Sequence, residues 1–356
     1  MLSRALGSLI AASMLLAQNN PRSQGEAQAP PSQPAQAEPA ASPRSQIRVQ
    51  VNEVIVPVTV TDDKGKFVSN LDASDFKVYE EGKEQQIRFF TRERSQPVVV
   101  GFLIDQSNAM KLHWKNYLQD SAQELVLALL PGDPKYSGYL ISYANDAELA
   151  VNTTSDSEKI IDKIRKMKPG GGAALYDAIY MACTNRALVK GEPIEPRRVV
   201  IIIGDGHDNA SKHTLDQVIE LAQRNLVTVY AVSTVGFGFS GEGEPALKRL
   251  ADETGGRVVH PLQNIYDSVD GYLEKPSDEG NYALKVGTGG YGTMVASNVI
   301  KAVANVAGEV NTQYIIRYIP AGVSPGKDNT FRRIRVEVAL PSVKIRTRTG
   351  YFPENP

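Results

Sequence analysis

The chain has little cysteine, histidine or net charge, and each shortage excludes a class of protein. A single cysteine, Cys183, excludes an internal disulfide, so the fold must be stabilised by a packed core in which this small residue is expected to be buried. The four histidines lack the spacing of a zinc motif such as His-Glu-x-x-His. The net charge of −1 argues against a nucleic-acid partner, because binding to phosphates requires a strongly basic surface.

Long apolar runs are equally scarce, and the one near the start of the chain is typical of a targeting signal. Residues 5–17 are apolar, follow Arg4 and are too few to span a bilayer comfortably. We therefore predict a signal peptide over residues 1–17, with an uncleaved anchor as the alternative. No second run of this kind follows. We expect an exported protein, periplasmic or secreted, with no membrane span after signal cleavage.

Residues 18–46 form a segment rich in proline, alanine, glutamine and serine. A segment of this composition buries too little apolar surface to offset the entropy of ordering it. We predict a disordered, partly extended linker. A ligand for a proline-binding partner is the alternative.

The middle of the chain alternates strand patterns with helix patterns, which is typical of a doubly wound, mostly parallel sheet. Two apolar strand patterns, at residues 98–104 and 199–203, each run into an aspartate soon after they end. In open α/β sheets, ligands bind in the crevice outside the carboxyl ends of the strands. Asp105 and Asp205, together with Ser107, are therefore oxygen ligands at the expected place for a divalent cation.

The order of these loops resembles the von Willebrand factor type A (VWA) domain, a Rossmann-like α/β fold. The resemblance covers residues 97–262, with a last helix near 295–310. That family carries a metal-ion-dependent adhesion site, built from an Asp-x-Ser-x-Ser loop, a threonine in a Gly-Gly-Thr loop and a later aspartate. A glycine loop at residues 169–173 takes the place of the second of these loops.

The family resemblance implies that Asp105, Ser107 and Asp205 hold a metal ion. Two further ligand positions are occupied by Ala109 and Ala173, which have no side-chain oxygen. Mg²⁺ retains waters readily, so waters could fill these positions at the expense of affinity. Two interpretations stay open: a weak Mg²⁺ site, or a degenerate site kept as a scaffold. No other cofactor is expected.

The resemblance also implies a binding module for a protein partner. The predicted partner-binding rim comprises Asn108, Gly171, Gly172 and His207. We expect Asp208 to bond its own loop or the start of the following helix rather than a metal. A magnesium-dependent phosphoryl-transfer or other hydrolytic enzyme that uses Asp105 and Asp205 is the alternative. No Gly-x-Ser-x-Gly elbow is present, and we predict no catalytic residues and no enzyme activity.

The segments on either side of the α/β pattern alternate apolar and polar residues, as half-buried antiparallel strands do. We predict that residues 47–96 and 311–356 join into one β-sandwich, with the α/β domain of residues 97–310 inserted between them. Two small β units packed separately are the alternative. The motifs at residues 76–82 and 346–352 resemble an exported family of VWA-related proteins typical of acidobacterial genomes.

Residues 263–292 fit the family pattern poorly. Their glycines at 287–292 match the dinucleotide pattern G-x-G-x-x-G, but no convincing strand precedes them. We predict an irregular surface loop that is mobile or contacts a partner.

The final strands carry a group of arginines that we predict to lie on the solvated face of a sheet. A basic stripe that meets an acidic surface or lipid headgroups is the alternative. The group comprises Arg332, Arg333, Arg335, Arg346 and Arg348.

Overall fold

The computed structural model describes most of the chain after residue 52. The described ranges are residues 53–92, 97–111, 114–185, 197–235, 241–262, 288–320 and 330–353. The predicted signal peptide, the predicted linker, the strand pattern at 47–51 and most of the predicted loop at 263–292 lie outside these ranges. Within them, no helix is at once long enough and apolar enough to cross a membrane.

One six-stranded sheet forms the centre of the α/β domain. Its strands are β5 (Val98–Asp105), β6 (Tyr136–Tyr143), β7 (Ala147–Thr154), β8 (Arg197–Gly204), β9 (Val227–Ser233) and β10 (Val258–Val259). They lie in the order β10-β9-β8-β5-β6-β7, and all neighbouring pairs are parallel except β6 and β7. Strands β5 and β9 are buried along their whole length, which is what their continuous apolar runs predicted.

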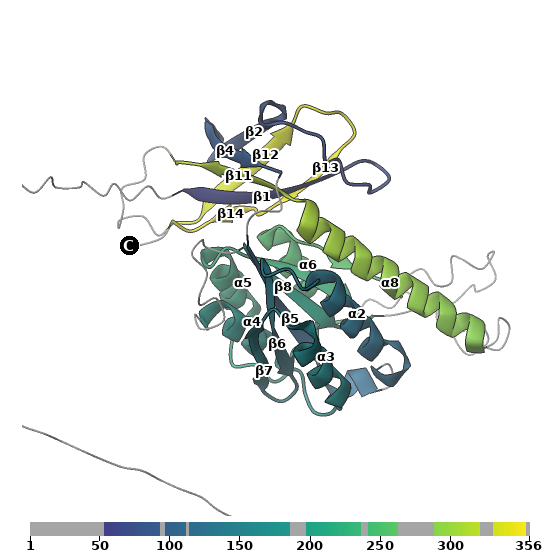
Figure 1. Cartoon of the computed structure of the whole chain (residues 1–356). Coiled ribbons are helices and arrows are strands. Elements are labelled where there is room, and N and C mark those ends of the chain that lie inside the picture. Colours follow the sequence, from purple (N-terminus) through teal and green to yellow (C-terminus); the bar gives the residue numbers. More distant parts are fainter. Residues whose placement is uncertain are drawn as a thin grey trace, which may run out of the picture. The chain divides into compact units, whose positions relative to one another are not determined.

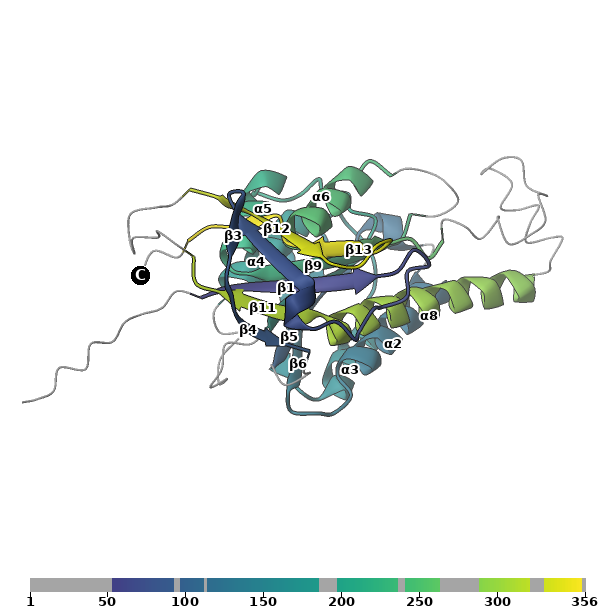
Figure 2. The ribbon, with the colours of Figure 1, turned by 90° about the horizontal axis from the view of Figure 1, so that it is seen from above.

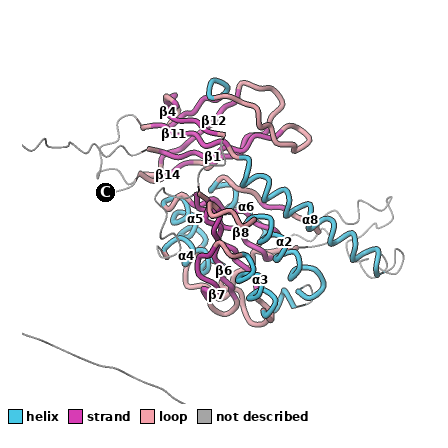
Figure 3. The backbone as a smooth tube through the Cα atoms, in the orientation of Figure 1, coloured by secondary structure: helices cyan, strands magenta, loops and turns pink. Residues whose placement is uncertain are grey.

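Helices cover both faces of this sheet, as Figures 1 and 3 show. One face is covered by α2 (Gln119–Leu129), α3 (Ser157–Lys166) and α8 (Thr288–Thr312). The other is covered by α4 (Leu175–Thr184), α5 (Leu215–Arg224) and α6 (Glu244–Thr254). Two short helical segments, η2 (Asn108–Met110) and η3 (Trp114–Leu118), connect β5 to α2. The predicted doubly wound α/β architecture is confirmed.

The helix boundaries follow local chemistry where the sequence carries a clear capping signal. Thr214 and Gln217 form a capping box at the start of α5, and Asp156 caps α3. Helix α6 ends at Gly255, which takes a left-handed conformation at φ 87°. Local side-chain and backbone chemistry therefore sets one end of each of these three helices.

Helix α8 corrects the prediction for the end of the 263–292 loop. We expected the last helix to begin near residue 295, but it begins at Thr288 and includes Gly289, Gly290 and Gly292. The helix takes in residues of low helix propensity because the helical backbone bonds continue from the residues that follow them. The G-x-G-x-x-G pattern therefore lies mainly at the start of a helix rather than in a loop.

Two four-stranded sheets form the β-sandwich. Their strands are β1 (Val54–Thr61), β2 (Phe76–Glu80), β3 (Lys83–Gln85), β4 (Ile87–Thr91), β11 (Tyr314–Tyr318), β12 (Arg332–Val338), β13 (Lys344–Thr347) and β14 (Gly350–Tyr351), with a short helical turn η1 (Ala73–Asp75) before β2. The sheet orders are β13-β1-β11-β4 and β14-β12-β2-β3.

Both sheets combine strands from before and after the α/β domain. Strand β1 lies between β13 and β11, as the view in Figure 2 shows, and β12 pairs with β2. One apolar core unites the two sheets, with Val56, Val78, Ile316 and Val336 among its members. A single sandwich built from both flanking segments is therefore confirmed, and two separate β units are excluded.

The hairpin turn at Glu81 and Gly82 is followed by two short strands that belong to different sheets. Both turn residues have positive φ angles, 47° and 77°. Strand β3 pairs with β2, whereas β4 pairs with β11 in the other sheet. The chain crosses between the sheets at residue 86, and this crossing depends on β11, which lies more than two hundred residues later in the chain.

The predicted solvated position of the arginines is wrong for three of the five. Arg332 is paired with the buried Glu80, and Arg346 is paired with Glu309 of α8. Arg348 is buried, with 3% of its surface exposed. The alternating pattern could not reveal these burials, because the partners lie on elements distant in the sequence.

Candidate functional site

Asp105 and Asp205 lie at the same edge of the central sheet. Strands β5 and β8 are parallel neighbours, and Ile104 is paired with Ile203. Asp105 is the last residue of β5, and Asp205 directly follows β8. The predicted convergence of the two aspartates at the carboxyl ends of neighbouring strands is therefore what the strand pairing produces.

The carboxyl group of Asp105 is almost fully buried, with 1% of the residue exposed. Its Oδ1 accepts a hydrogen bond of 2.7 Å from the N–H of Ser107. Its Oδ2 is buried and has no hydrogen-bond partner among the described residues. Burial raises the pKa of Asp105 to about 7, and the charge of Asp205 adds to the rise, while the bonds from Ser107 oppose it.

Tyr143 lies beside this carboxyl group and was not among the predicted site residues. Its hydroxyl is buried and has no hydrogen-bond partner in the described ranges. A Cβ atom added to Gly204 would lie 2.5 Å from this hydroxyl and 3.1 Å from Asp105 Oδ2, so the glycine leaves room for both groups. Burial raises the pKa of Tyr143 well above its usual value. The only sequence signal for Tyr143 was its position at the carboxyl end of β6, level with Asp105.

The first and second loops of the site are joined by backbone hydrogen bonds. The N–H of Asn108 donates to the carbonyl of Gly171 at 3.0 Å, and the N–H of Gly170 donates to the carbonyl of Gln106 at 2.6 Å. Gly171 has a φ of 99°, a conformation that favours glycine. The predicted rim residues Asn108 and Gly171 are therefore in direct contact.

Two asparagines that were not among the predicted site residues hold the second loop in place. Asn145 Oδ1 accepts the N–H of Gly172 at 2.6 Å, and Asn209 Oδ1 accepts the N–H of Ala173 at 2.9 Å. The N–H of Asn209 in turn donates to the carbonyl of Ala173 at 3.0 Å. Side-chain amides thus bind the loop backbone at and beside the position where the family pattern has threonine.

The third loop is held by its own carboxylates. Asp205 Oδ1 accepts the N–H of His207 at 2.9 Å, and Asp208 accepts the N–H of Tyr176 at 2.8 Å and the hydroxyl of Ser211 at 2.6 Å. Asp208 therefore bonds its own loop, as expected. The helix whose start it caps is α4, however, and not the following helix α5.

The residues at this edge fit a divalent cation only in part. The buried, unpartnered Oδ2 of Asp105 is an oxygen that a cation would satisfy, and Ser107 and Asp205 add two more donors. Ala109 and Ala173 add none, whereas Mg²⁺ demands nearly octahedral oxygen coordination. The described ranges contain no cluster of three or more acidic, histidine or cysteine residues that could hold a metal. Water molecules would have to supply many of the ligands of any cation bound at this edge.

Comparison with known proteins identifies the central domain. Residues 100–268 match the von Willebrand factor type A domain. An uncharacterized protein of Borreliella burgdorferi is 31% identical over 148 residues, which are 41% of this chain and 41% of that protein. The matched part of this chain therefore spans less than half of the length of that relative.

Solved structures are similar to this chain at low sequence identity, among them the following two. A von Willebrand factor type A protein from Catenulispora acidiphila is 11% identical, with 86% of this chain and 75% of that chain covered and a TM-score of 0.41. An aerotolerance-related membrane protein from Bacteroides fragilis is 18% identical, with coverages of 60% and 99% and a TM-score of 0.40. The family match, on a doubly wound sheet with its three loops at the carboxyl edge, shows that residues 100–268 form a von Willebrand factor type A domain.

Proposed function

We propose that the domain binds a protein partner through the rim around Asp105, Ser107 and Asp205. The observation that carries this proposal is the convergence of three loops at one sheet edge, with the backbone contact between Asn108 and Gly171. Domains of this family are generally interaction modules rather than enzymes. Asn108 and Ala109 are exposed above the buried carboxyl group, so a partner has direct access to the rim.

We also propose that the protein acts outside the cytoplasm. The apolar residues 5–17 after Arg4 support an export signal, and residues 18–46 support a linker between that signal and the folded part. The motifs at residues 76–82 and 346–352 support membership of the exported VWA-related family typical of acidobacteria. Edman sequencing of the protein purified from its native exported fraction tests these points, since a mature amino terminus near residue 18 is expected.

A bound Mg²⁺ would be held by Asp105, Ser107 and Asp205, and it would offer a coordination position to a carboxylate of the partner. The two alanines make this interaction weak. Binding through the rim then rests mainly on the protein's own groups, among them Gly172 and His207. Metal binding by the parent chain is tested by comparison with a variant in which the two missing side-chain oxygens are restored.

The restoring experiment replaces Ala109 by serine and Ala173 by threonine. We expect the parent chain to bind Mn²⁺ or Mg²⁺ weakly, and the double variant to bind at least about tenfold more tightly for each restored ligand, or about 1.4 kcal/mol each. Calorimetric titration and the metal-dependent rise in melting temperature measure the difference.

The matched control adds Asp205→Asn to the double variant, which should abolish the gain because a carboxylate ligand is lost. If neither the parent nor the double variant binds metal, the three loops do not form a metal site. A purified partner that binds equally to the parent and to a rim variant such as Asn108→Arg would overturn the proposed surface.

A further inference from the structure

Arg348 is a buried charge with no counter-ion among the described residues. It lies between β13 and β14, and 3% of its surface is exposed. Its Nη2 donates a long hydrogen bond of 3.4 Å to the carbonyl oxygen of Leu226. Its Nε has no hydrogen-bond partner within the described residues. Burial lowers the pKa of Arg348 to about 10. An isolated buried charge is costly, so an arginine in this position calls for a compensating group.

Neighbouring arginines of the same strands have such a group. Arg332 is paired with Glu80, Arg335 with Glu337 and Arg346 with Glu309. No carboxylate of the described ranges forms an ion pair with Arg348. Arg333 of β12 also lacks an ion pair within the described residues, but it is exposed to solvent, whereas Arg348 is buried.

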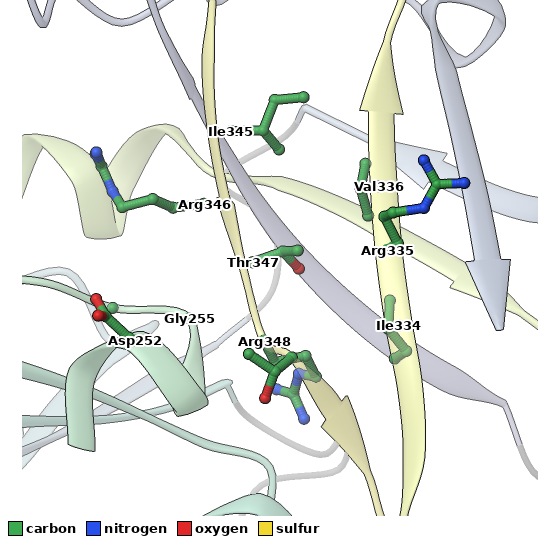
Figure 4. Close-up of a pocket in the computed structure, with 11 residues that line it drawn as sticks. Asp252, Gly255, Ile334, Arg335, Val336, Ile345, Arg346, Thr347 and Arg348 are labelled. Atoms are coloured by element: carbon green, nitrogen blue, oxygen red, sulfur yellow. The ribbon is translucent and has the colours of Figure 1, made fainter. Parts of the chain in front are cut away.

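A cavity of about 330 Å³ adjoins Arg348. It lies between β12, β13 and the end of α6, and Figure 4 shows Ile334, Val336, Ile345 and Thr347 along the gap between the two strands. Arg335 and Arg346 extend to opposite sides, away from this gap. The cavity thus has aliphatic walls, and at its end lies Arg348, which forms no ion pair with any residue that the structure describes. Its size is at the lower end of the range for small-molecule sites.

One carboxylate also borders the cavity, and it is already paired. Asp252 of α6 is 2.5 Å from the ammonium group of Lys248. Figure 4 places Asp252 on the far side of β13 from Ile334 and Val336. It therefore leaves the charge of Arg348 uncompensated.

We propose that this cavity binds a carboxylate with a short aliphatic body, with the carboxylate against Arg348 and the aliphatic part between Ile334, Val336 and Ile345. A planar guanidinium binds a carboxylate with strong, charge-assisted hydrogen bonds. Such a group is present in a free branched-chain acid and at the carboxyl end of a peptide with an aliphatic last residue. The site is separate from the rim at Asp105 and does not depend on the function proposed for it.

The test uses the full chain and four probes. They are isovalerate, its uncharged amide isovaleramide, and a short peptide ending in valine with either a free or an amidated carboxyl group. We expect saturable binding of isovalerate, of the free-acid peptide or of both, measured by calorimetry and by changes in amide chemical shifts around Arg348. The pair of acids separates the two sources of the carboxylate, and the amides should not bind.

Two variants locate the site. Arg348→Met should weaken binding about tenfold to a hundredfold, which is the range for a charged hydrogen bond, and it should not lower the melting temperature, because it removes an unpaired buried charge. Ile345→Phe, at the partly buried wall, should block the cavity with Arg348 in place.

Absence of binding by both acids at millimolar concentration would overturn the proposal, as would equal binding of the amides or undiminished binding by Arg348→Met. A melting temperature of Arg348→Met far below that of the parent would assign the arginine a structural role instead. Should that variant fail to fold, undiminished binding by Ile345→Phe would overturn the proposal by itself.

Discussion

Replacing Glu309 by glutamine is expected to lower the free energy of unfolding by about 3–5 kcal/mol. The side chain of Glu309 has no exposed surface, and its carboxylate forms ion pairs with Arg257 and Arg346. Arg346 donates two hydrogen bonds to Glu309, from Nε to Oε1 at 3.1 Å and from Nη2 to Oε2 at 2.9 Å. Arg257 Nε lies 2.8 Å from Glu309 Oε2. A neutral amide would leave both cations without their counter-charge in a poorly solvated position.

The position of Glu309 gives the change a second consequence. Helix α8 belongs to the α/β domain, Arg257 precedes β10 of the same domain, and Arg346 belongs to β13 of the sandwich. Gln313 adds a bond of 3.1 Å to Thr59 and one of 2.9 Å to Tyr230, so it links the same two parts of the fold. Loss of the Glu309 charge should therefore weaken the connection between sandwich and α/β domain.

Urea unfolding followed by both fluorescence and circular dichroism measures this effect. The parent should unfold in one transition, and the variant in a transition at lower urea or in two separate steps. Glu242→Gln serves as the control, because Glu242 is an exposed carboxylate and its replacement should change stability by no more than about 0.5 kcal/mol. A loss of less than about 1 kcal/mol for Glu309→Gln would contradict the assigned role.

Replacing Asp105 by asparagine is expected to stabilise the metal-free protein above pH 7 by about 2–4 kcal/mol. Burial raises the pKa of this carboxyl group from 3.8 to about 7, so the folded state resists its ionisation. Asparagine keeps the acceptor oxygen for the N–H of Ser107 but carries no charge. The same substitution removes a proposed metal ligand, so we expect stability to rise while any metal response falls.

The sign of the pH dependence follows from the direction of this shift. Between pH 4 and 7 the folded state binds more protons at Asp105 than the unfolded state does, so the contribution of this group to stability falls as the pH rises. The difference between variant and parent should be small at pH 4, grow through this window and level off above pH 7. Other carboxyl groups, such as Asp177 and Glu244, whose pKa values are lowered, contribute equally to both proteins.

Chemical denaturation of parent and variant at a series of pH values gives this difference directly. Asp63→Asn is the control, since Asp63 is an exposed carboxylate of the sandwich and its replacement should give no difference that grows between pH 4 and 7. A constant difference across the whole pH range would mean that Asp105 is ionised in the folded protein, and the account of its environment would then be wrong.

The order of strands and helices in the α/β domain was predictable because it depends on local patterns. Apolar runs such as that of β5 become strands buried on both faces, and capping residues such as Thr214 and Gly255 mark helix ends through bonds to neighbouring backbone. Where local and distant effects compete the prediction failed, as at Thr288, where α8 begins several residues before the expected position.

The residues of the candidate site likewise fall into those that local patterns predict and those that distant contacts decide. Asp105 and Asp205 could be placed together from the sequence, because parallel strands bring their carboxyl ends to one edge. Tyr143, Asn145 and Asn209 could not, since their role depends on the path of loops from other strands.

The sequence by itself determined the alternation of strand and helix and the edge at which the two aspartates meet. Only the tertiary structure decided which arginines are buried, which carboxylates neutralise them, and that Arg348 has no such partner among the described residues. The physical reason is that periodicity reports a residue's own strand or helix, whereas burial and charge pairing are set by groups that the chain brings together from far apart.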